Sequence, residues 1–379
     1  MRKLRVGVIG AGMMGQNHIE AIRRIPGTEV VALADANLQF AKSIADKLGI
    51  ENVYGDYSVM LEEANLDVVH NCTPNSLHYA INKDIIKHNI NVYCEKPLAN
   101  TAEETSELAR LAEQHKVFTA VNFNYRHNAI VREMHERVAD KAEWGNTYLV
   151  HGQYVQDWMM YDSDYNWRCV PAIGGPSRTV ADIGSHWFDT VQYILGEKIV
   201  RVNAELTTVL PQRKKFAAQG ATFTSQSGDD FEWVDIDTED TAFITVEFES
   251  GVKGNVVLSQ VSGGHKNDFC IHIDGSSYSM NWEQENADKL VIGSREIGNI
   301  LRHAGPEMLR GSAKGYGTLP SGHPVGWADA LKNAISAFYT AVSGGEAPAY
   351  ATFADGDYTV RIVEACLRSS KTKTWTEVK

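Results

Sequence analysis

The chain has 379 residues, of which 43% are hydrophobic and 22% charged, and this suits a globular protein of about two to three domains. Its 36 basic and 48 acidic residues give a net charge of −12, which argues against a nucleic-acid-binding surface of clustered Lys and Arg. No apolar run approaches the ~18 residues that a transmembrane helix needs, so we expect no membrane partner.

The first 125 or so residues alternate short apolar runs with helical patterns, which predicts a doubly wound parallel α/β sheet. Pro26 and Gly27 stop the first helix, Gly49 stops the second, and Thr101 with Glu104 forms a capping box that opens the third. The predicted strands are residues 4–9, 30–34, 53–54, 67–72, 92–94 and 117–121, and the predicted helices are 13–25, 39–48 and 101–115. We therefore predict a first domain of this class, with the topology of a Rossmann fold, over residues 1–125.

After residue 126 the pattern changes to alternating strands, which predicts an α+β domain with a large, mainly antiparallel open sheet over residues 126–379. We expect residues 211–240 to be a polar surface excursion and residues 300–324 to be a Gly-rich loop. The predicted helix is 130–138, and the predicted strands are 147–156, 200–209, 241–249, 253–261, 269–273 and 278–282. Two closing helices are predicted over residues 328–342 and 357–367, and we expect them to pack back on the first domain.

The cysteines indicate a reducing compartment and no structural metal. There are five, an odd number, and none forms a Cys-x-x-Cys pair, which argues against a disulfide framework and a zinc site. We therefore expect a cytoplasmic protein without a bound metal ion. The apolar stretch after Arg2, Lys3 and Arg5 is broken by four glycines within residues 7–15, so we expect no secretory signal peptide.

A G-x-G-x-x-G motif follows the first predicted strand and opens a helix. Gly10 permits the tight turn, Gly12 lets the backbone approach a pyrophosphate, and Gly15 lets helix and strand pack closely. Asp35 follows the second strand, 20 residues after Gly15, and can accept ribose hydroxyls but would repel a 2′-phosphate, so NAD is preferred over NADP. The alternative is a glycine-rich turn without a ligand, in which Asp35 caps a helix.

Two polar segments lie where predicted parallel strands end, the edge at which doubly wound sheets bind ligands. Lys96, in Glu95-Lys96-Pro97, can hydrogen-bond a reacting hydroxyl and stabilise its alkoxide character, although a surface lysine is the alternative. Thr73-Pro74-Asn75, with His78, can line the nicotinamide or its ribose, and a simple capped helix start is the alternative.

Asp182 and His186 stand at positions i and i+4, which face the same way if the segment is helical. A carboxylate beside an imidazole raises its basicity and orients the ring, as expected for a general base near neutral pH. The alternative is an N-cap aspartate followed by a helix-face histidine. Asp189, one turn further, can equally be structural.

These motifs, in this order and spacing over nearly the whole chain, resemble the Gfo/Idh/MocA family of sugar and inositol oxidoreductases. The resemblance implies a Rossmann domain, a mainly antiparallel sheet domain, NAD as cofactor, and a homodimer or homotetramer formed through the open sheet face. It implies a catalytic set in which His186 is the acid/base, Lys96 orients and polarises the reacting oxygen, and Asp182 positions its neighbours. The implied cofactor-binding residues are Gly10, Gly12, Met13, Met14, Gly15, Asp35, Thr73, Pro74, Asn75, His78, Glu95 and Lys96.

Further segments resemble a longer-chain branch of that family. They contain Trp158, Trp167, Arg168 and His323, and an aromatic face beside a planar multidentate donor suits a polyol ring. We therefore predict that these four residues bind substrate. The alternative is that the Trp residues are packing anchors. We favour that packing interpretation for Trp327. Arg126, at the end of the sixth predicted strand, can serve the substrate or the domain junction.

Together these features predict an NAD-dependent dehydrogenase that oxidises a ring secondary hydroxyl of an inositol, a sugar or a glycoside. Two alternatives stay open. One is a keto-sugar reductase, because the residues do not encode the direction of the reaction. The other is a dinucleotide-binding sensor without catalysis, although such a protein would not need the set of Lys96, Asp182 and His186.

Overall fold

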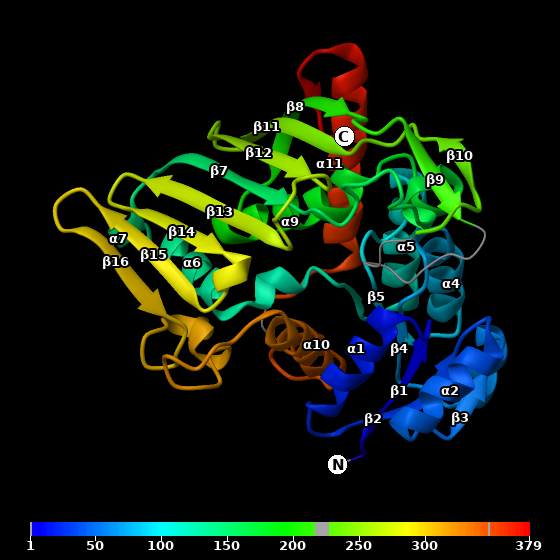
Figure 1. The fold of residues 1–379 in the computed structure, drawn as a ribbon. Helices are drawn as coiled ribbons and strands as arrows, with labels where there is room; N and C mark the ends of the chain where they lie inside the picture. The colour runs from blue at the N-terminus through cyan, green and yellow to red at the C-terminus, as the bar shows by residue number, and fades with distance from the viewer. Residues whose placement is uncertain (1, 217–226, 348) are drawn as a thin grey trace. The chain divides into compact units, whose positions relative to one another are not determined.

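A computed structural model describes residues 2–216, 227–347 and 349–379 of the chain (Figure 1). The chain divides into two compact units. The first unit comprises Met1–His127 and Trp327–Tyr358, and the second comprises Asn128–Gly326 and Thr359–Lys379. None of the described helices is both long and apolar enough to cross a lipid bilayer.

The first unit is built on a parallel sheet whose hydrogen-bonded strands follow the order β3-β2-β1-β4-β5-β6. Val6 and Val8 of β1 and Val68 and Val69 of β4 are completely buried, as expected for strands with both faces covered. The strand order reverses between β1 and β4, and doubly wound sheets bind ligands at such a point. The strands are β1 (Leu4–Ile9), β2 (Thr28–Ala34), β3 (Asn52–Tyr54), β4 (Val68–Asn71), β5 (Asn91–Cys94) and β6 (Thr119–Val121).

Helices cover both faces of this sheet. On one face, α1, α2 and α10 contribute Ile19, Ile44 and Phe338 to a buried apolar cluster, and on the other, α4 and α5 contribute Ile85 and Leu108. The helices of this unit are α1 (Met13–Arg23), α2 (Leu38–Leu48), α3 (Tyr57–Glu63), α4 (Asn75–Lys87), α5 (Ala102–His115), the 3₁₀ turn η1 (Asn124–His127) and α10 (Trp327–Val342). Helix α11 (Phe353–Thr372) begins in the first unit and ends in the second.

The helix boundaries follow the predicted local signals where those signals are strong. Gly49 ends α2 in the left-handed conformation at φ 60°, which a residue without a Cβ adopts at little cost. The Thr101 side chain accepts a hydrogen bond from the Glu104 backbone N–H and so caps α5. Helix α3 was not predicted, and its N-cap is Asp56, whose carboxylate accepts a hydrogen bond from the Ser58 backbone N–H.

The second unit contains a larger sheet in the order β16-β15-β14-β13-β7-β12-β11-β8-β17. Strand β12 pairs in parallel with β7, and the other neighbouring pairs are antiparallel. Helices α6 and α9 pack against one face of this sheet (Figure 1). The predicted fold class, a doubly wound domain followed by a mainly antiparallel sheet domain, is therefore confirmed. The sheet strands are β7 (Thr147–Val155), β8 (Ile199–Thr207), β11 (Thr241–Phe248), β12 (Lys253–Ser259), β13 (Asp268–Gly275), β14 (Ser279–Glu283), β15 (Lys289–Ser294), β16 (Gly298–His303) and β17 (Thr376–Glu377).

Among the described residues of the second unit, no helix covers the central strands on the opposite face of the larger sheet. In β11, Ala242, Ile244 and Val246 are buried, whereas Phe243 between them is 59% exposed. This period of two shows that one face is covered and the other open. The remaining elements of the unit are α6 (Ala129–Ala139), α7 (Lys141–Trp144), η2 (Trp167–Cys169), α8 (Pro171–Gly174), η3 (Val180–Gly184), α9 (Ser185–Leu195), η4 (Gln284–Asn286) and η5 (Gly311–Gly315).

Two expectations about loops were wrong. The segment 211–240 is not only a surface excursion, because it contains the hairpin β9 (Gln212–Phe216) and β10 (Phe231–Asp235) and two completely buried charged residues, Arg213 and Asp240. Residues 217–226 of that segment lie outside the described part. The segment 300–324 begins inside β16 and contains η5, so it is not one loop. Ile300 and Leu301 of β16 are both exposed at the sheet edge, which removes the alternation that marks a half-buried strand.

Candidate active site

The glycine motif forms a tight turn between β1 and α1. Gly10 has a φ of +97°, and a Cβ there would lie 2.6 Å from the Cys72 carbonyl oxygen. A Cβ on Gly15 would lie 1.9 Å from the Gly10 carbonyl oxygen, so the close approach of helix to strand requires glycine. A Cβ on Gly12 would meet no described atom within 4 Å, which leaves open space in front of the helix.

The start of α1 offers donors and a carboxylate to a ligand. Gly12 is the N-cap of α1 and has no side chain to cap it, and Met13, the first helical residue before Met14, is 49% exposed. The Asp35 carboxylate accepts hydrogen bonds from the backbone N–H of Ala11 at 2.8 Å and of Asn37 at 2.9 Å. Asn37, not Asp35, caps α2. Backbone N–H groups at a helix start, beside a carboxylate at the end of the next strand, fit the pyrophosphate and ribose of a dinucleotide.

The loops after β4 and β5 are joined by one buried ring. His78 is completely buried, and its two ring nitrogens lie 2.7 Å from the Pro97 carbonyl oxygen and 2.8 Å from the Thr73 carbonyl oxygen. Burial lowers the pKa of His78 from its usual value. Pro74 is the N-cap of α4 and Asn75 is its first residue. The predicted cofactor-binding residues of these two loops are thus held at one edge of the sheet.

Glu95 follows β5, immediately before Lys96, and is buried. Its Oε1 atom lies 2.9 Å from His18 Nε2 and 2.6 Å from Asn122 Nδ2, and its Oε2 atom accepts the Lys96 backbone N–H at 3.2 Å. Burial alone would raise the pKa of Glu95. The hydrogen bond and charge of His18, the charge of Lys96 and the Asn122 hydrogen bond outweigh burial and hold it at about 2. Glu95 is therefore an ionised acceptor next to Lys96.

The contacts of Glu95 continue into a row of buried groups that we call the histidine chain: Tyr339, His70, His18 and Glu95. His18 Nδ1 lies 2.8 Å from His70 Nδ1, and His70 Nε2 lies 2.8 Å from the Tyr339 hydroxyl. Burial lowers the pKa of His70 well below its usual value, so its ring is neutral. Since an ionised Glu95 only accepts, His18 must donate to it through Nε2. Sequence reasoning missed His18 and His70, because no local pattern connects residues so far apart.

In the second unit, Asp182 and His186 lie on consecutive helical segments. Asp182 is in η3, a single π-helical turn, and His186 is in the first turn of α9, with 7% of its surface exposed. Such widened turns inside helices occur often at functional sites. Asp182 Oδ2 accepts a hydrogen bond from Gln260 Nε2 at 2.9 Å, and Asp182 Oδ1 lies 3.6 Å from Arg168 Nε. The His186 ring lies beside Tyr154, with ring centroids 6.3 Å apart.

Arg168 contacts three of the predicted site residues, Trp158, Trp167 and Asp182. Its guanidinium carbon lies 4.3 Å from the centre of the Trp167 ring and 5.6 Å from that of Trp158. Both tryptophans are half-buried, and Trp158 Nε1 donates to Gln156 Oε1 at 3.0 Å. Arg168 Nη1 is buried and has no hydrogen-bond partner among the described residues. A buried donor of this kind costs free energy unless a ligand oxygen accepts from it.

The other predicted substrate residues make contacts of their own. His323 is exposed, and its Nδ1 atom lies 3.0 Å from the Pro320 carbonyl oxygen of its own loop. Arg126, in η1 of the first unit, is buried and pairs with Asp355 at 3.2 Å. Trp327 opens α10 and packs, partly buried, against an apolar cluster of the first unit. Among the described residues, no group of three His, Cys, Asp or Glu side chains is placed to hold a metal.

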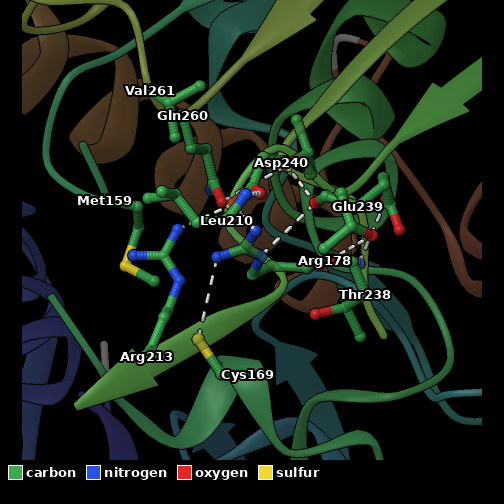
Figure 2. Close-up of polar contacts among 12 residues, drawn as sticks. Met159, Cys169, Arg178, Leu210, Arg213, Thr238, Glu239, Asp240, Gln260 and Val261 are labelled. Atoms are coloured by element: carbon green, nitrogen blue, oxygen red, sulfur yellow. Dashed lines mark hydrogen bonds and ion pairs between the residues drawn. The ribbon is translucent and has the colours of Figure 1, made fainter. Parts of the chain in front are cut away.

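Behind Asp182 lies a second buried group that sequence reasoning missed. We call it the arginine cluster, and its members are Arg178, Arg213, Glu239 and Asp240 (Figure 2). Asp240 Oδ1 accepts from both guanidinium groups, at 2.8 Å from Arg213 Nη2. Burial lowers the pKa of Arg213, and repulsion from Arg178 lowers it further. Nothing in a single sequence marks these charges as buried, since charged side chains are mostly exposed.

Comparison with known proteins gives a consistent result. The family described as "Oxidoreductase family, NAD-binding Rossmann fold" matches residues 4–123, and the "GFO/IDH/MocA C-terminal domain" matches residues 131–280. Levoglucosan dehydrogenase of Pseudarthrobacter phenanthrenivorans is 27% identical to the chain, across 100% of the chain and 99% of that protein. D-glucoside 3-dehydrogenase of Escherichia coli is 27% identical across 90% of the chain and 96% of that protein. A solved structure of levoglucosan dehydrogenase in complex with NADH and levoglucosan has a TM-score of 0.89 and 26% identity, covering 100% of both chains.

Proposed function

The chain belongs to the Gfo/Idh/MocA family of oxidoreductases, and we propose that it is an NAD-dependent dehydrogenase of a cyclic polyol. The substrate class is an inositol, a sugar or a glycoside, oxidised at a ring secondary hydroxyl. The observation that carries this proposal is the group in the second unit where Arg168 lies over two tryptophans and pairs with Asp182, one helical turn before His186. Relatives named as levoglucosan, D-glucoside and inositol dehydrogenases support the substrate class.

The first unit supports NAD as the cofactor. Open space at Gly12 and the uncapped start of α1 suit a pyrophosphate, and the Asp35 carboxylate suits ribose hydroxyls. A 2′-phosphate at that position would meet the negative charge of Asp35, which favours NAD over NADP. When bound, NAD supplies the nicotinamide carbon that accepts a hydride.

The second unit supports binding of a polyol ring. An aromatic face covers the C–H side of a sugar ring, and a planar guanidinium donates to two neighbouring oxygens. Trp158 and Trp167 provide such faces, and Arg168 Nη1 is a buried donor without a partner among the described residues. We assign these three side chains to the substrate, with the Asp182 carboxylate as the opposite charge that orients Arg168.

Hydride loss from a carbinol carbon requires that the hydroxyl also lose its proton. We assign that proton to His186, which is nearly buried at the start of α9. A general base of this kind accelerates the step by about 10² to 10⁴-fold.

Lys96 is assigned to the same reaction because the order of the motifs resembles that of the family. Its ammonium would donate a hydrogen bond to the reacting oxygen and stabilise the negative charge that develops there. Glu95, the preceding residue, places an ionised carboxylate next to this lysine. Removal of the lysine should therefore impair the chemical step more than cofactor binding.

The direct test of the proposal is an NADH-absorbance screen of the purified protein against inositols, hexoses and glycosides, with NAD and NADP in parallel. We expect NADH formation with at least one cyclic polyol and little or none with NADP. The reverse reaction, NADH with keto-sugars, tests the reductase alternative in the same assay. NAD binding without turnover across the whole panel would contradict the proposal and favour a sensor.

We also propose a cytoplasmic location and a homodimer or homotetramer. All five cysteines are free, which suits a reducing compartment. The open face of the larger sheet carries exposed apolar side chains such as Phe243 and Leu149, which suits a contact with a second copy. Light scattering of the purified protein tests the oligomer, and a monomer at all concentrations would contradict it.

A further inference from the structure

The hairpin β9–β10 sends one charged side chain into the interior of the second unit. Arg213 is completely buried, whereas Lys215, two residues along the same strand, pairs with Glu232 at the surface. Taking a guanidinium out of water is costly unless it is paired and fully hydrogen-bonded. Two of its nitrogen atoms, Nη1 and Nη2, are hydrogen-bonded, and Nε is buried without a partner among the described residues.

Arg213 is hydrogen-bonded to the loop that leads to Trp167 and Arg168. Its Nη1 atom donates to the carbonyl oxygens of Tyr161 at 2.8 Å and Asp164 at 2.9 Å. Three to four residues after Asp164, the chain reaches Trp167 and Arg168. The Nη2 atom of the same guanidinium donates to Asp240. One planar side chain thus links this loop to Asp240. A lysine, whose charge is compact, cannot make these hydrogen bonds in the same geometry.

Arg178 makes the corresponding link on the other side of Asp240. It donates to Asp240, to the Glu239 carbonyl oxygen at 3.3 Å and to the Cys169 sulfur at 3.7 Å (Figure 2). Cys169 is the residue that follows Arg168. The loop that carries Arg168 is therefore held by both arginines.

Glu239 and Asp240 also hold the turn that contains Asp182. Glu239 Oε1 accepts the backbone N–H of Val180 at 2.9 Å, and Val180 is the first residue of η3. The Gln260 backbone N–H donates to the Asp240 carbonyl oxygen at 3.0 Å, and the Gln260 side chain donates to Asp182. Because the Asp182 carboxylate only accepts, the Gln260 amide must present its Nε2 atom to it.

We propose that Arg213 and Gln260 are positioning residues that hold Arg168 and Asp182 in register for the polyol. This inference rests on the proposed function. Arg168 and Asp182 come from separate segments, and the arginine cluster is hydrogen-bonded to both segments. Four formal charges that balance one another, fully buried, fix these segments in a defined geometry rather than simply adding stability.

The test is a kinetic comparison of Arg213→Met and Gln260→Leu with wild type and with Lys215→Met, a surface variant on the same strand. We expect KM for the polyol to rise about tenfold in the first two variants, equivalent to about 1.4 kcal/mol of lost binding. NAD affinity should change less than about twofold, since the first unit holds those residues. Arg213→Lys should recover only part of the loss, and Lys215→Met should behave as wild type.

A double-mutant cycle separates positioning from general destabilisation. If Arg213 acts through Arg168, then Arg213→Met should raise KM less than about twofold further in an Arg168→Met background. A merely structural role would lower the active fraction, and hence the apparent kcat, while leaving KM unchanged. Hydrogen exchange gives a second readout: residues 161–169 and 179–186 should both exchange faster in Arg213→Met than in Lys215→Met.

The outcomes distinguish this inference from the proposed function. An active wild type whose KM is unchanged by Arg213→Met and Gln260→Leu would overturn the inference and leave the function standing. Additive KM effects in the cycle, or unchanged hydrogen exchange in both segments, would overturn it as well. A wild type without turnover on any polyol would overturn the proposed function, and this inference with it.

Discussion

The histidine chain of the first unit and the arginine cluster of the second both bury polar side chains behind a predicted site residue, but they use different chemistry. The histidine chain lies behind Lys96 and is built from rings, a hydroxyl and a single carboxylate. The arginine cluster lies behind Asp182 and is built from two guanidinium groups and two carboxylates. The hydrogen bonds of the histidine chain depend on which ring nitrogens carry protons, whereas those of the arginine cluster join groups of fixed charge.

This difference suits the parts that the two residues play in the proposed reaction. Lys96 works through its charge, and Glu95 beside it is an ionised acceptor whose donors include His18. Asp182 works through its position, and the arginine cluster contains no histidine whose charge changes near neutral pH. We infer that one region tunes charge and the other fixes geometry.

The largest expected effect comes from removing a reacting group in either region. Lys96→Ala and His186→Ala should each lower kcat at least about a hundredfold, because each removes a group that acts on the reacting oxygen. NAD should still bind, which fluorescence titration can measure. Near-normal steady-state rates in both variants would remove the proposed mechanism.

Breaking the arginine cluster should cost the second unit far more stability than a substitution at its surface. Asp240→Asn leaves two buried guanidinium groups without their shared carboxylate, and removing one member of a buried ion pair costs about 3–5 kcal/mol. Urea unfolding measures the loss. Asp235→Asn, an exposed residue of β10, is the matched control and should change the unfolding free energy by less than about 0.5 kcal/mol. Equal effects of the two variants would contradict the assigned burial.

Breaking the histidine chain should have a smaller effect that a shape-matched amide repairs. His18→Leu leaves the buried Glu95 carboxylate without one donor, which costs about 1–3 kcal/mol. His18→Gln keeps one donor for Glu95, so it should recover most of that loss. The same urea unfolding measurement compares them. If both variants lose the same stability, His18 contributes something other than these hydrogen bonds.

The smallest expected effect is a pH dependence specific to the histidine chain. Because burial holds the pKa of His70 below its ordinary value, the unfolded chain binds a proton near pH 6.5 that the folded chain does not. The unfolding free energy should therefore fall as pH falls below 6.5, with His70 contributing up to about 1.4 kcal/mol per pH unit.

The variant His70→Gln should make that dependence shallower between pH 6.5 and pH 5. The buried His78 also has a lowered pKa and will keep part of the slope. His323→Gln, at an exposed position, is the control and should leave the slope unchanged. An identical slope in His70→Gln and wild type would contradict a neutral, buried His70.

The parts of the fold that depend on local sequence could be predicted. The doubly wound sheet follows from apolar runs separated by helical patterns, and the turn at Gly10 and Gly15 follows from backbone sterics that allow no Cβ. Asp35 is recognisable because it directly follows the strand beside that turn. The edge strand β16 was missed because its side chains are exposed on both sides and carry no alternation.

The supporting residues of the candidate site could not be predicted from the sequence. Arg213 and Asp240 come from a polar segment that has the composition of a surface loop, and their burial follows only from pairing with each other and with Arg178. Gln260 follows β12 without any motif, and its contact with Asp182 depends on how two distant segments pack. Side-chain pairing across such separations is a property of the folded chain.

The central claim is that a hydride leaves a ring carbinol carbon for NAD. The most direct measurement uses the best substrate from the screen, deuterated at that carbon, with mass spectrometry of the reduced cofactor. The account predicts that the label appears in the nicotinamide product, which would be heavier than unlabelled NADH by one mass unit. Reduced cofactor without the label, formed while the ring hydroxyl is oxidised, would contradict direct transfer and the mechanism built on it.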